Sequence, residues 1–141
     1  MVYRSAPGPR PLVFVHDDTA LALDPESGRT LWAYAMSKGS IARMAFSEDR
    51  VFLLDTDCVV HCVAADTGAL VGRVAVAAPS AWGAALLTQG SMLFVATTEG
   101  VCALSSEGRI VWSRTSPGSG SGRALPGLGT SSQIFQPDFK E

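Results

Sequence analysis

The sequence predicts an all-β fold made of about three repeated units, each a set of short antiparallel strands. Two observations lead to this prediction. One short pattern recurs along the 141 residues at a period of forty, most plainly in the turn glycines Gly28, Gly68 and Gly108. The apolar runs between the turns are short, rich in β-branched and aromatic residues, and closed by clusters of Gly, Asp or Ser. That pattern is typical of strands joined by tight turns.

The first repeat is one strand shorter than the other two. Its expected strands lie at residues 11–15, 21–23 and 30–36. Asp17-Asp18 separates the first two apolar runs and predicts a hairpin turn. Pro25 and Gly28 predict the next turn, because proline presets φ and glycine accepts the left-handed exit. One strand position, at the inner or the outer edge of this unit, is therefore left open.

The second and third repeats each have four predicted strands. These lie at residues 41–46, 50–54, 59–64 and 69–75, and at 83–88, 91–96, 101–104 and 109–114. Thr56-Asp57 and Glu99-Gly100 take the place of Asp17-Asp18, and a glycine there tolerates a positive φ. Four short antiparallel strands in about forty residues is the composition of a β-propeller blade.

One motif of the first repeat resembles that of a known family. It reads Ala22-x-Asp24-x-x-Ser27-Gly28-Arg29-x-x-Trp32. This is similar to the tryptophan-docking motif of PQQ-like (quinoprotein-type) β-propeller repeats, Ala-x-Asp-x-x-Thr-Gly-Lys-x-x-Trp. The third copy keeps the spacing from Gly108 to Trp112 but is one residue shorter before the glycine, and the second has Gly72 where the tryptophan would stand. The resemblance covers residues 12 to 115.

The resemblance implies a packing role for the tryptophans. Trp32 and Trp112 are expected to cover a turn of the neighbouring blade, so that the turn glycines Gly28, Gly68 and Gly108 form the docking positions. A buried indole also seeks a carbonyl for its N–H. The alternative role for these rings is stacking on a ligand. Trp82 lies outside this register, at the entry to the third blade, and is expected to be a surface aromatic that contacts a partner.

The chain is expected to divide into four segments. They are an extended arm at 1–11, three blades at 12–115, a Gly/Ser linker at 116–122 and a C-terminal strand or docking tail at 123–141. Propellers close with about 4–8 blades, so three blades are a partial ring. We expect a homodimer that closes a six-bladed ring. The alternatives are docking on another protein and a segment cut from a longer propeller.

The C-terminal segment carries the residues that we expect to bind a partner, Ile134, Phe135 and Phe139. Phe135 lies 41 residues after Phe94, so the segment also looks like the first half of a fourth copy. It could add one short strand to an open sheet edge, with Pro137 ending that strand. The alternative is a disordered tail.

Two groups of polar residues are candidate sites. Cys58, His61 and Cys62 have a suggestive spacing, but on one strand the two thiols lie about 13 Å apart and cannot share a zinc ion. We therefore expect two core thiols with an outward-facing histidine, and no metal site. The carboxylates of the hairpin turns are expected to form a solvated rim rather than a cation site; they are Asp17, Asp18, Asp55, Asp57 and Glu99.

Composition narrows the function classes. A hydrophobic fraction of 47% suffices for a packed core, and a net charge of −2 without basic clusters is unlike a nucleic-acid binder. No apolar run approaches the roughly 20 residues of a membrane span. The N-terminus lacks the apolar region of a secretory signal, and three cysteines fit reduced thiols in the cytoplasm.

No catalytic motif stands out in the sequence. Quinone-dependent relatives use a closed funnel with a cation and a disulfide platform, which this chain does not offer, so we expect no cofactor and no enzymatic activity. The sequence predicts a scaffold for protein–protein assembly. Two alternatives stay open, namely a propeller subunit or sensor domain of a larger enzyme, such as a kinase or dehydrogenase, and a small-ligand binder at the propeller channel.

Overall fold

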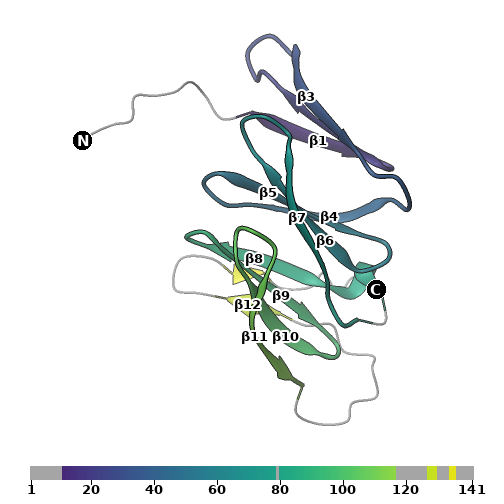
Figure 1. The fold of residues 1–141 in the computed structure, drawn as a ribbon, viewed down its shortest axis with the longest axis vertical. Coiled ribbons are helices and arrows are strands. Elements are labelled where there is room, and N and C mark those ends of the chain that lie inside the picture. Colours follow the sequence, from purple (N-terminus) through teal and green to yellow (C-terminus); the bar gives the residue numbers. More distant parts are fainter. Residues whose placement is uncertain (1–10, 79, 117–126, 130–133, 136–141) are drawn as a thin grey trace, which may run out of the picture.

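A computed structural model describes residues 11–78, 80–116, 127–129 and 134–135 (Figure 1). Three antiparallel sheets, which we call blades 1, 2 and 3, follow one another along the long axis of the molecule (Figure 1). In each blade the strands pair in sequence order. The predicted all-β fold is confirmed. No helix in the described part of the chain is long and apolar enough to cross a membrane.

The strands lie close to their predicted positions. Blade 1 contains β1 (Leu12–His16), β2 (Thr19–Leu23) and β3 (Thr30–Ala35). Blade 2 contains β4 (Ile41–Phe46), β5 (Arg50–Asp55), β6 (Val59–Ala64) and β7 (Leu70–Ala75). Blade 3 contains β8 (Ala85–Gln89), β9 (Met92–Thr97), β10 (Gly100–Leu104) and β11 (Ile110–Thr115).

The entry to blade 3 differs from the prediction of a strand from residue 83. A short 3₁₀ helix, η1 (Ala81–Gly83), precedes β8 instead. The Ser80 hydroxyl accepts a hydrogen bond from the Trp82 amide at 3.2 Å and so caps this turn. The backbone is extended again from Ala84, and β8 begins at Ala85.

One register repeats in all three blades and shows which strand blade 1 lacks. We call a set of residues that are paired directly across neighbouring strands a row. Equivalent rows are Val13–Ala22–Trp32 in blade 1, Ala45–Phe52–Cys62–Gly72 in blade 2 and Leu87–Phe94–Ala103–Trp112 in blade 3. A β-bulge follows the row member on the last strand but one of each blade, Ala22 on β2, Cys62 on β6 and Ala103 on β10. Strands β1–β3 are thus the counterparts of β5–β7 and β9–β11. The missing strand is the inner one, equivalent to β4 and β8, which pack against each other.

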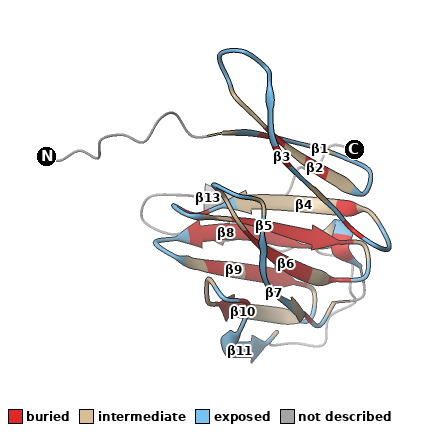
Figure 2. Ribbon diagram, turned by 45° about the horizontal axis from the view of Figure 1, so that its top comes forward, coloured by how far each residue is buried: buried red, intermediate tan, exposed pale blue. Residues whose placement is uncertain are grey.

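The hydrophobic core is divided between the two junctions of neighbouring blades. One cluster joins blades 1 and 2 and includes Trp32, Val51 and Leu53. A larger cluster joins blades 2 and 3 and includes Phe52 and Leu93. Strands β5 and β6 of blade 2 are therefore buried on both faces, whereas the outer strands β3, β7 and β11 are largely exposed (Figure 2).

The C-terminal region contributes a small two-stranded sheet beside blade 3. Strands β12 (Leu128–Gly129) and β13 (Ile134–Phe135) pair antiparallel and lie next to β8. The pair Leu128↔Phe135 repeats the pair Leu87↔Phe94, so β12 takes the inner-strand position of a fourth blade. The predicted arm at 1–11 and linker at 116–122 lie, apart from residues 11 and 116, outside the described residues, as does most of the tail.

Candidate interaction surface

The junction of blades 1 and 2 is built around Trp32. Its side chain, at the outer end of the blade 1 row, is 8% exposed and covers the β6–β7 turn of blade 2. A Cβ atom on Gly68 in that turn would lie 2.6 Å from the Trp32 Cδ2 atom, so only glycine fits. The indole Nε1–H donates to the Ala65 carbonyl at 2.9 Å. Trp32 thus makes the contact that the resemblance implied, and it does so with Gly68.

The junction of blades 2 and 3 has the same geometry without an indole. Gly72 stands where Trp32 stands in blade 1. The β10–β11 turn of blade 3 lies directly on it, because a Cβ on Gly72 would come closer to the Glu107 carbonyl oxygen than a real Cβ can. Gly108 of that turn faces the Gly72 backbone and the Cys62 sulfur. Each junction therefore brings a glycine turn of the later blade onto the row of the earlier one.

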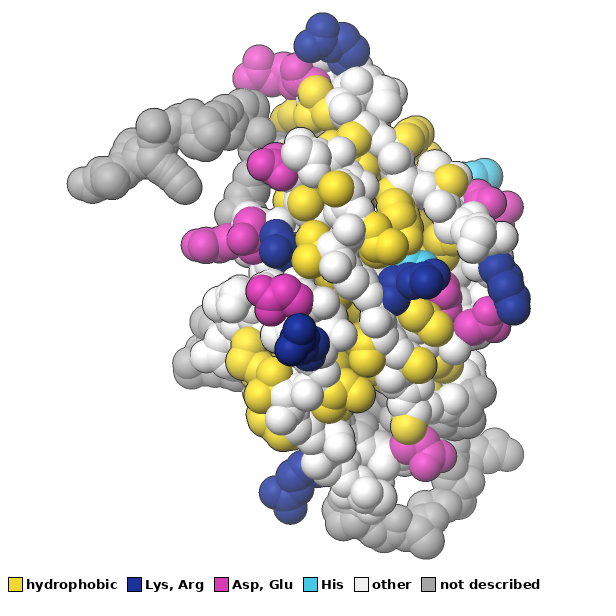
Figure 3. All heavy atoms as spheres, viewed as in Figure 1, with side chains coloured by type: hydrophobic (Ala, Val, Ile, Leu, Met, Phe, Trp, Pro, Cys, Tyr) yellow, Lys and Arg dark blue, Asp and Glu magenta, His cyan; other side chains and the backbone are white. Residues whose placement is uncertain are grey.

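The row of blade 3 has no later glycine turn on it within the described residues. Trp112 is 43% exposed, and its only aromatic neighbour in the described part of the chain is Phe94 of the same row, 6.2 Å away. The implied docking of Trp112 is therefore not made with any described residue, because a complete fourth blade is absent there. Ile110 and Val111 of β11 are also exposed, Ile110 beside Val76 on the side of blade 3 that faces blade 2, and Figure 3 shows apolar side chains gathered over blade 3.

Blade 1 has an uncovered glycine turn on the face that points away from blade 2. Gly28 has a φ of +78° like its counterparts, yet no described atom lies within 4 Å of the position a Cβ would take. Leu12 and Phe14 of β1 point to this same face and are 56% and 52% exposed. Their counterparts in the later blades are almost completely buried by the preceding blade; they are Val51 and Leu53 in blade 2, and Leu93 and Val95 in blade 3.

We call the two surfaces the tryptophan face, the Leu87–Phe94–Ala103–Trp112 row, which is buried at Leu87 and Ala103 and open at Trp112, and the glycine face, formed by Leu12, Phe14 and the turn at Gly28. The sequence did not single out Leu12 or Phe14. The signal was available, because residues 12, 51 and 93 hold the same place in their repeats.

A polar network crosses the junction of blades 1 and 2, and it corrects two predictions. His61 is 5% exposed, not outward-facing, with Nδ1 2.7 Å from the Tyr34 hydroxyl and Nε2 2.8 Å from Asp55 Oδ2. Asp55 is 5% exposed and so is not part of a solvated rim; its Oδ1 accepts the amides of Asp57 and Val59. With an ionised Asp55, His61 Nε2–H donates and Nδ1 accepts the Tyr34 hydroxyl hydrogen.

Burial supports these assignments. It raises the pKa of the Tyr34 hydroxyl, which therefore keeps its proton as a donor. The other turn carboxylates, Asp17, Asp18, Asp57 and Glu99, are exposed as expected. The network is a cross-blade connection that spacing in the sequence did not indicate.

The three thiols are free and buried. Burial raises the pKa of all three, and that of Cys62 to about 11, so none is a ready nucleophile or metal ligand near neutral pH. Within the described ranges no three His, Cys, Asp or Glu side chains gather closely enough to hold a metal ion.

Trp82, the predicted surface aromatic, is 57% exposed on η1. The Arg43 guanidinium carbon lies 5.9 Å from the centre of its ring and the guanidinium also donates to the Trp82 and Ala84 carbonyls. This arginine ties η1 to β4. Of the predicted tail residues, Ile134 and Phe135 make up strand β13, and Phe139 lies outside the described residues.

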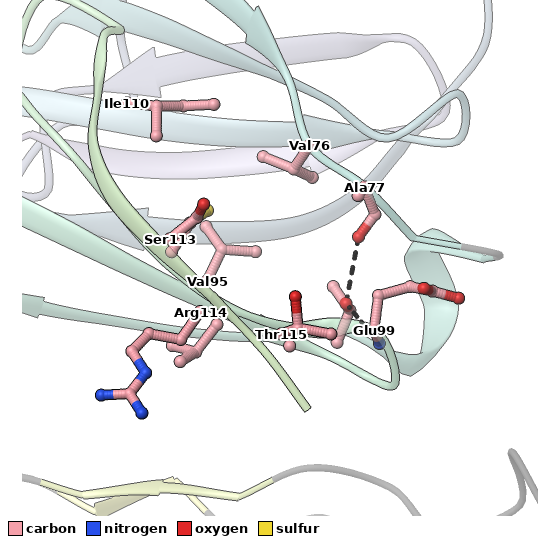
Figure 4. A pocket seen from close by; sticks show the side chains of 12 residues that line it. Val76, Ala77, Val95, Glu99, Ile110, Ser113, Arg114 and Thr115 are labelled. Carbon is pink, nitrogen blue, oxygen red and sulfur yellow. Dashed lines mark hydrogen bonds between the residues drawn. The ribbon is translucent and has the colours of Figure 1, made fainter. Parts of the chain in front are cut away.

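A small pocket lies between the end of blade 2 and the outer strands of blade 3 (Figure 4). Val76, Ala77, Val95, Ser113 and Thr115 are among its lining residues, and its volume is about 170 Å³. Thr97 closes one side by donating to the Ala77 carbonyl at 3.1 Å. The charged ends of its Arg114 and Glu99 side chains point away from each other and outward (Figure 4). The pocket is smaller than the roughly 300–1,000 Å³ of typical ligand sites.

Comparison with known proteins shows two kinds of similarity. A PQQ-repeat family model described as outer membrane protein assembly factor BamB matches residues 16–137, whereas no curated protein matches the chain. The crystal structure of BamB from Moraxella catarrhalis is similar over 73% of this chain, at 22% identity and a TM-score of 0.59. A europium-containing methanol dehydrogenase is similar over 78%, at 16% identity and a TM-score of 0.60.

These structural similarities show the fold alone, because both identities are low. The chain spans 33% of the length of the BamB structure and 24% of that of the dehydrogenase.

Proposed function

The chain belongs to the PQQ-repeat family of the outer membrane protein assembly factor BamB, as the sequence predicted, and from this membership we propose that it is a non-catalytic β-propeller scaffold for protein–protein assembly. The observation that carries the proposal is the tryptophan face. It has the same in-register row that buries Trp32 at the first junction, yet Trp112 at its end is 43% exposed. An exposed apolar side chain whose counterpart is buried at a blade junction marks this end of the row as a site of protein contact.

The name of the family model supports the same role. It describes an assembly factor, and one of the similar structures carries the same name. The buried free thiols suit a reducing compartment, so we place the protein in the cytoplasm as part of this proposal. Cell fractionation with the tagged chain tests the location independently of the role.

The role is tested by comparing two exposed tryptophans. The tagged full chain captures partners, which are identified by mass spectrometry, and the Trp112→Ala and Trp82→Ala variants are measured in parallel. We expect Trp112→Ala to lose at least one partner that Trp82→Ala keeps, because only Trp112 belongs to the inter-blade row. Capture that is equal for all three proteins would contradict the tryptophan face as an assembly site.

A second candidate is the propeller part of a larger enzyme. It is kept because one of the similar structures, a methanol dehydrogenase, carries this fold in an enzyme. Co-purification of an oxidoreductase or kinase polypeptide, with activity that requires this chain, would favour this role over a scaffold. The pocket of Figure 4 gives the small-ligand alternative weaker support, since it is small and its charged side chains point outward.

A further inference from the structure

We infer that a second copy of this chain is the partner of the tryptophan face, bound head to tail through its glycine face. The inference rests on the proposed assembly function and names the partner and the contact. In the assembly, Trp112 of one copy covers the turn at Gly28 of the next copy, as Trp32 covers the turn at Gly68 within the chain.

The first reason is that the two halves of one contact stand separately on the same molecule. Within the chain, Gly68 and Gly108 are each covered by the row of the preceding blade. Gly28 has the same positive φ and no neighbour among the described residues, and Trp112 has the same place in its row as Trp32 and no described glycine turn. An indole without its glycine turn and a glycine turn without its indole are complementary.

The second reason is the apolar surface around the two halves. Leu12 and Phe14 are more than half exposed on blade 1, where the equivalent Val51 and Leu53 of blade 2 are fully buried by the blade before them. A blade placed before blade 1 would bury them in the same way. Blade 3 of a second copy provides such a blade, because its row continues the pattern of the rows that precede blades 2 and 3.

The third reason is an acceptor for the indole N–H. At the first junction Trp32 Nε1–H donates to the Ala65 carbonyl. The carbonyl of the preceding residue, Ala64, accepts the Gly68 amide. In blade 1 the Gly28 amide donates to the Asp24 carbonyl at 2.7 Å, so Pro25 takes the place of Ala65. The Trp112 Nε1–H of one copy would therefore donate to the Pro25 carbonyl of the next.

The fourth reason concerns the missing inner strand of blade 1. Strand β12 already occupies the inner-strand position of the blade that comes after blade 3. Among the described residues it pairs with β13 through Leu128↔Phe135 and Gly129↔Ile134. In the assembly, β1 of the second copy replaces β13 beside β12, and the incomplete blade gains its fourth strand by β-augmentation. Two copies joined at both ends close six blades, within the range of about 4–8 seen in propellers.

The experiment measures the self-association of the full chain by sedimentation over a concentration series. Trp112→Ala removes the indole, and Gly28→Asn adds a side chain where the indole would lie. Asparagine tolerates a positive φ, and no described atom within 4 Å opposes its Cβ in the single chain. The matched controls are Trp82→Ala, an exposed indole outside the row, and Gly90→Asn, which has a φ of +62° and the same open surroundings.

We expect each of the two test variants to weaken association at least roughly 30-fold, the effect of removing an interfacial hot spot. Both controls stay within about threefold of the unaltered chain. Mixing Trp112→Ala with Gly28→Asn restores association in part, because the mixed pair keeps one intact contact between the Trp112 of one copy and the Gly28 of the other. This rescue also shows that both variants are folded.

Three results would overturn the inference. One is a monomer at all concentrations up to about 100 µM, well above the micromolar range of specific interfaces. Another is a loss of association with Trp112→Ala but not with Gly28→Asn, which indicates a symmetric contact between tryptophan faces. The last is the absence of rescue on mixing. A monomeric chain whose Trp112→Ala variant loses a different captured protein leaves the scaffold function standing and removes only the second copy as its partner.

Discussion

At the junction of blades 1 and 2 the earlier blade presents Trp32 to its neighbour, whereas at the junction of blades 2 and 3 it presents Gly72 in the same register position. In the first case an indole lies between the row and the Gly68 turn. In the second the Glu107–Gly108 turn lies on the backbone of Gly72 itself. The polar connections differ as well, because the buried Tyr34–His61–Asp55 network belongs to the first junction.

The difference shows that the position of the turn glycine is more constant than the residue that it meets. The Trp32 side chain fills the first junction and the Gly72 backbone fills the second, because the later blade approaches to a different distance in each and protein interiors pack to a fixed density. At the second junction two hydrogen bonds join the blades instead. Arg50 Nε–H donates to the Ser106 carbonyl at 2.9 Å, and the Thr88 hydroxyl donates to the Phe46 carbonyl. The two junctions should therefore respond differently to substitution.

Trp32→Ala should produce the largest loss, because it empties the first junction and leaves the Ala65 carbonyl without its donor. We expect the free energy of unfolding to fall by about 3–5 kcal/mol, the range for buried large aromatics. Urea unfolding followed by circular dichroism measures it, at concentrations too low for association. Trp82→Ala is the control, and a loss under about 1 kcal/mol would mean that the indole is not a packing element.

Gly72→Ala tests the second junction in the opposite direction, by adding a methyl group where Trp32→Ala removes a ring. The new Cβ would overlap the Glu107 carbonyl oxygen, and the blades must move apart. We expect a loss of about 1–3 kcal/mol, typical of overpacking. The neighbouring Val71→Ala, on an exposed position, should change stability much less. Equal effects of the two substitutions would argue against close backbone contact at this junction.

Tyr34→Phe should have a smaller effect that is confined to the first junction. It removes the hydroxyl that donates to His61 Nδ1 and keeps the ring, so we expect a loss of about 0.5–1.5 kcal/mol. The same substitution in a His61→Leu background should cost almost nothing, because the acceptor is gone. Additive costs in this double-mutant cycle would show that the two side chains do not interact.

Trp112→Ala should have the smallest effect on the stability of the single chain, although Trp112 holds the same position in its repeat as Trp32. The side chain is 43% exposed, so we expect the dilute monomer to lose less than about 1 kcal/mol. The measurement compares the loss in free energy of unfolding for Trp112→Ala with that for Trp32→Ala in the same urea unfolding assay. A loss of about 3–5 kcal/mol at this site would mean that the chain itself buries Trp112.

The sequence was sufficient for the strands and for the Trp32 contact, because both depend on local signals. Turn glycines, alternating apolar residues and a tryptophan four residues after Gly28 are all visible in one dimension. The surroundings of His61 were not. Alternation along β6 correctly separated His61 from Cys62, but it assigned the histidine side to solvent, whereas a blade between two others is covered on both faces.

Asp55 was misplaced for a related reason. A turn carboxylate is expected in solvent, but Asp55 Oδ1 accepts the amides of Asp57 and Val59 while Oδ2 lies against His61 Nε2, so the carboxylate is satisfied inside. The exposure of Trp112 could not be predicted either. It depends on whether a further blade packs against blade 3, and the motif itself does not specify that neighbour.

The sequence-order pairing of the strands has a consequence for how the protein folds. Within the part of the chain that the structure describes, every strand of blades 1 to 3 pairs only with a strand next to it in the sequence. The loops that close are therefore short, and the entropy lost in closing them is small. Each blade can form as a local meander before its neighbours, and cooperativity then spreads along a one-dimensional array of blades. Amide hydrogens should accordingly exchange slowest in blade 2, which has a neighbour on each side, and fastest in the three-stranded blade 1.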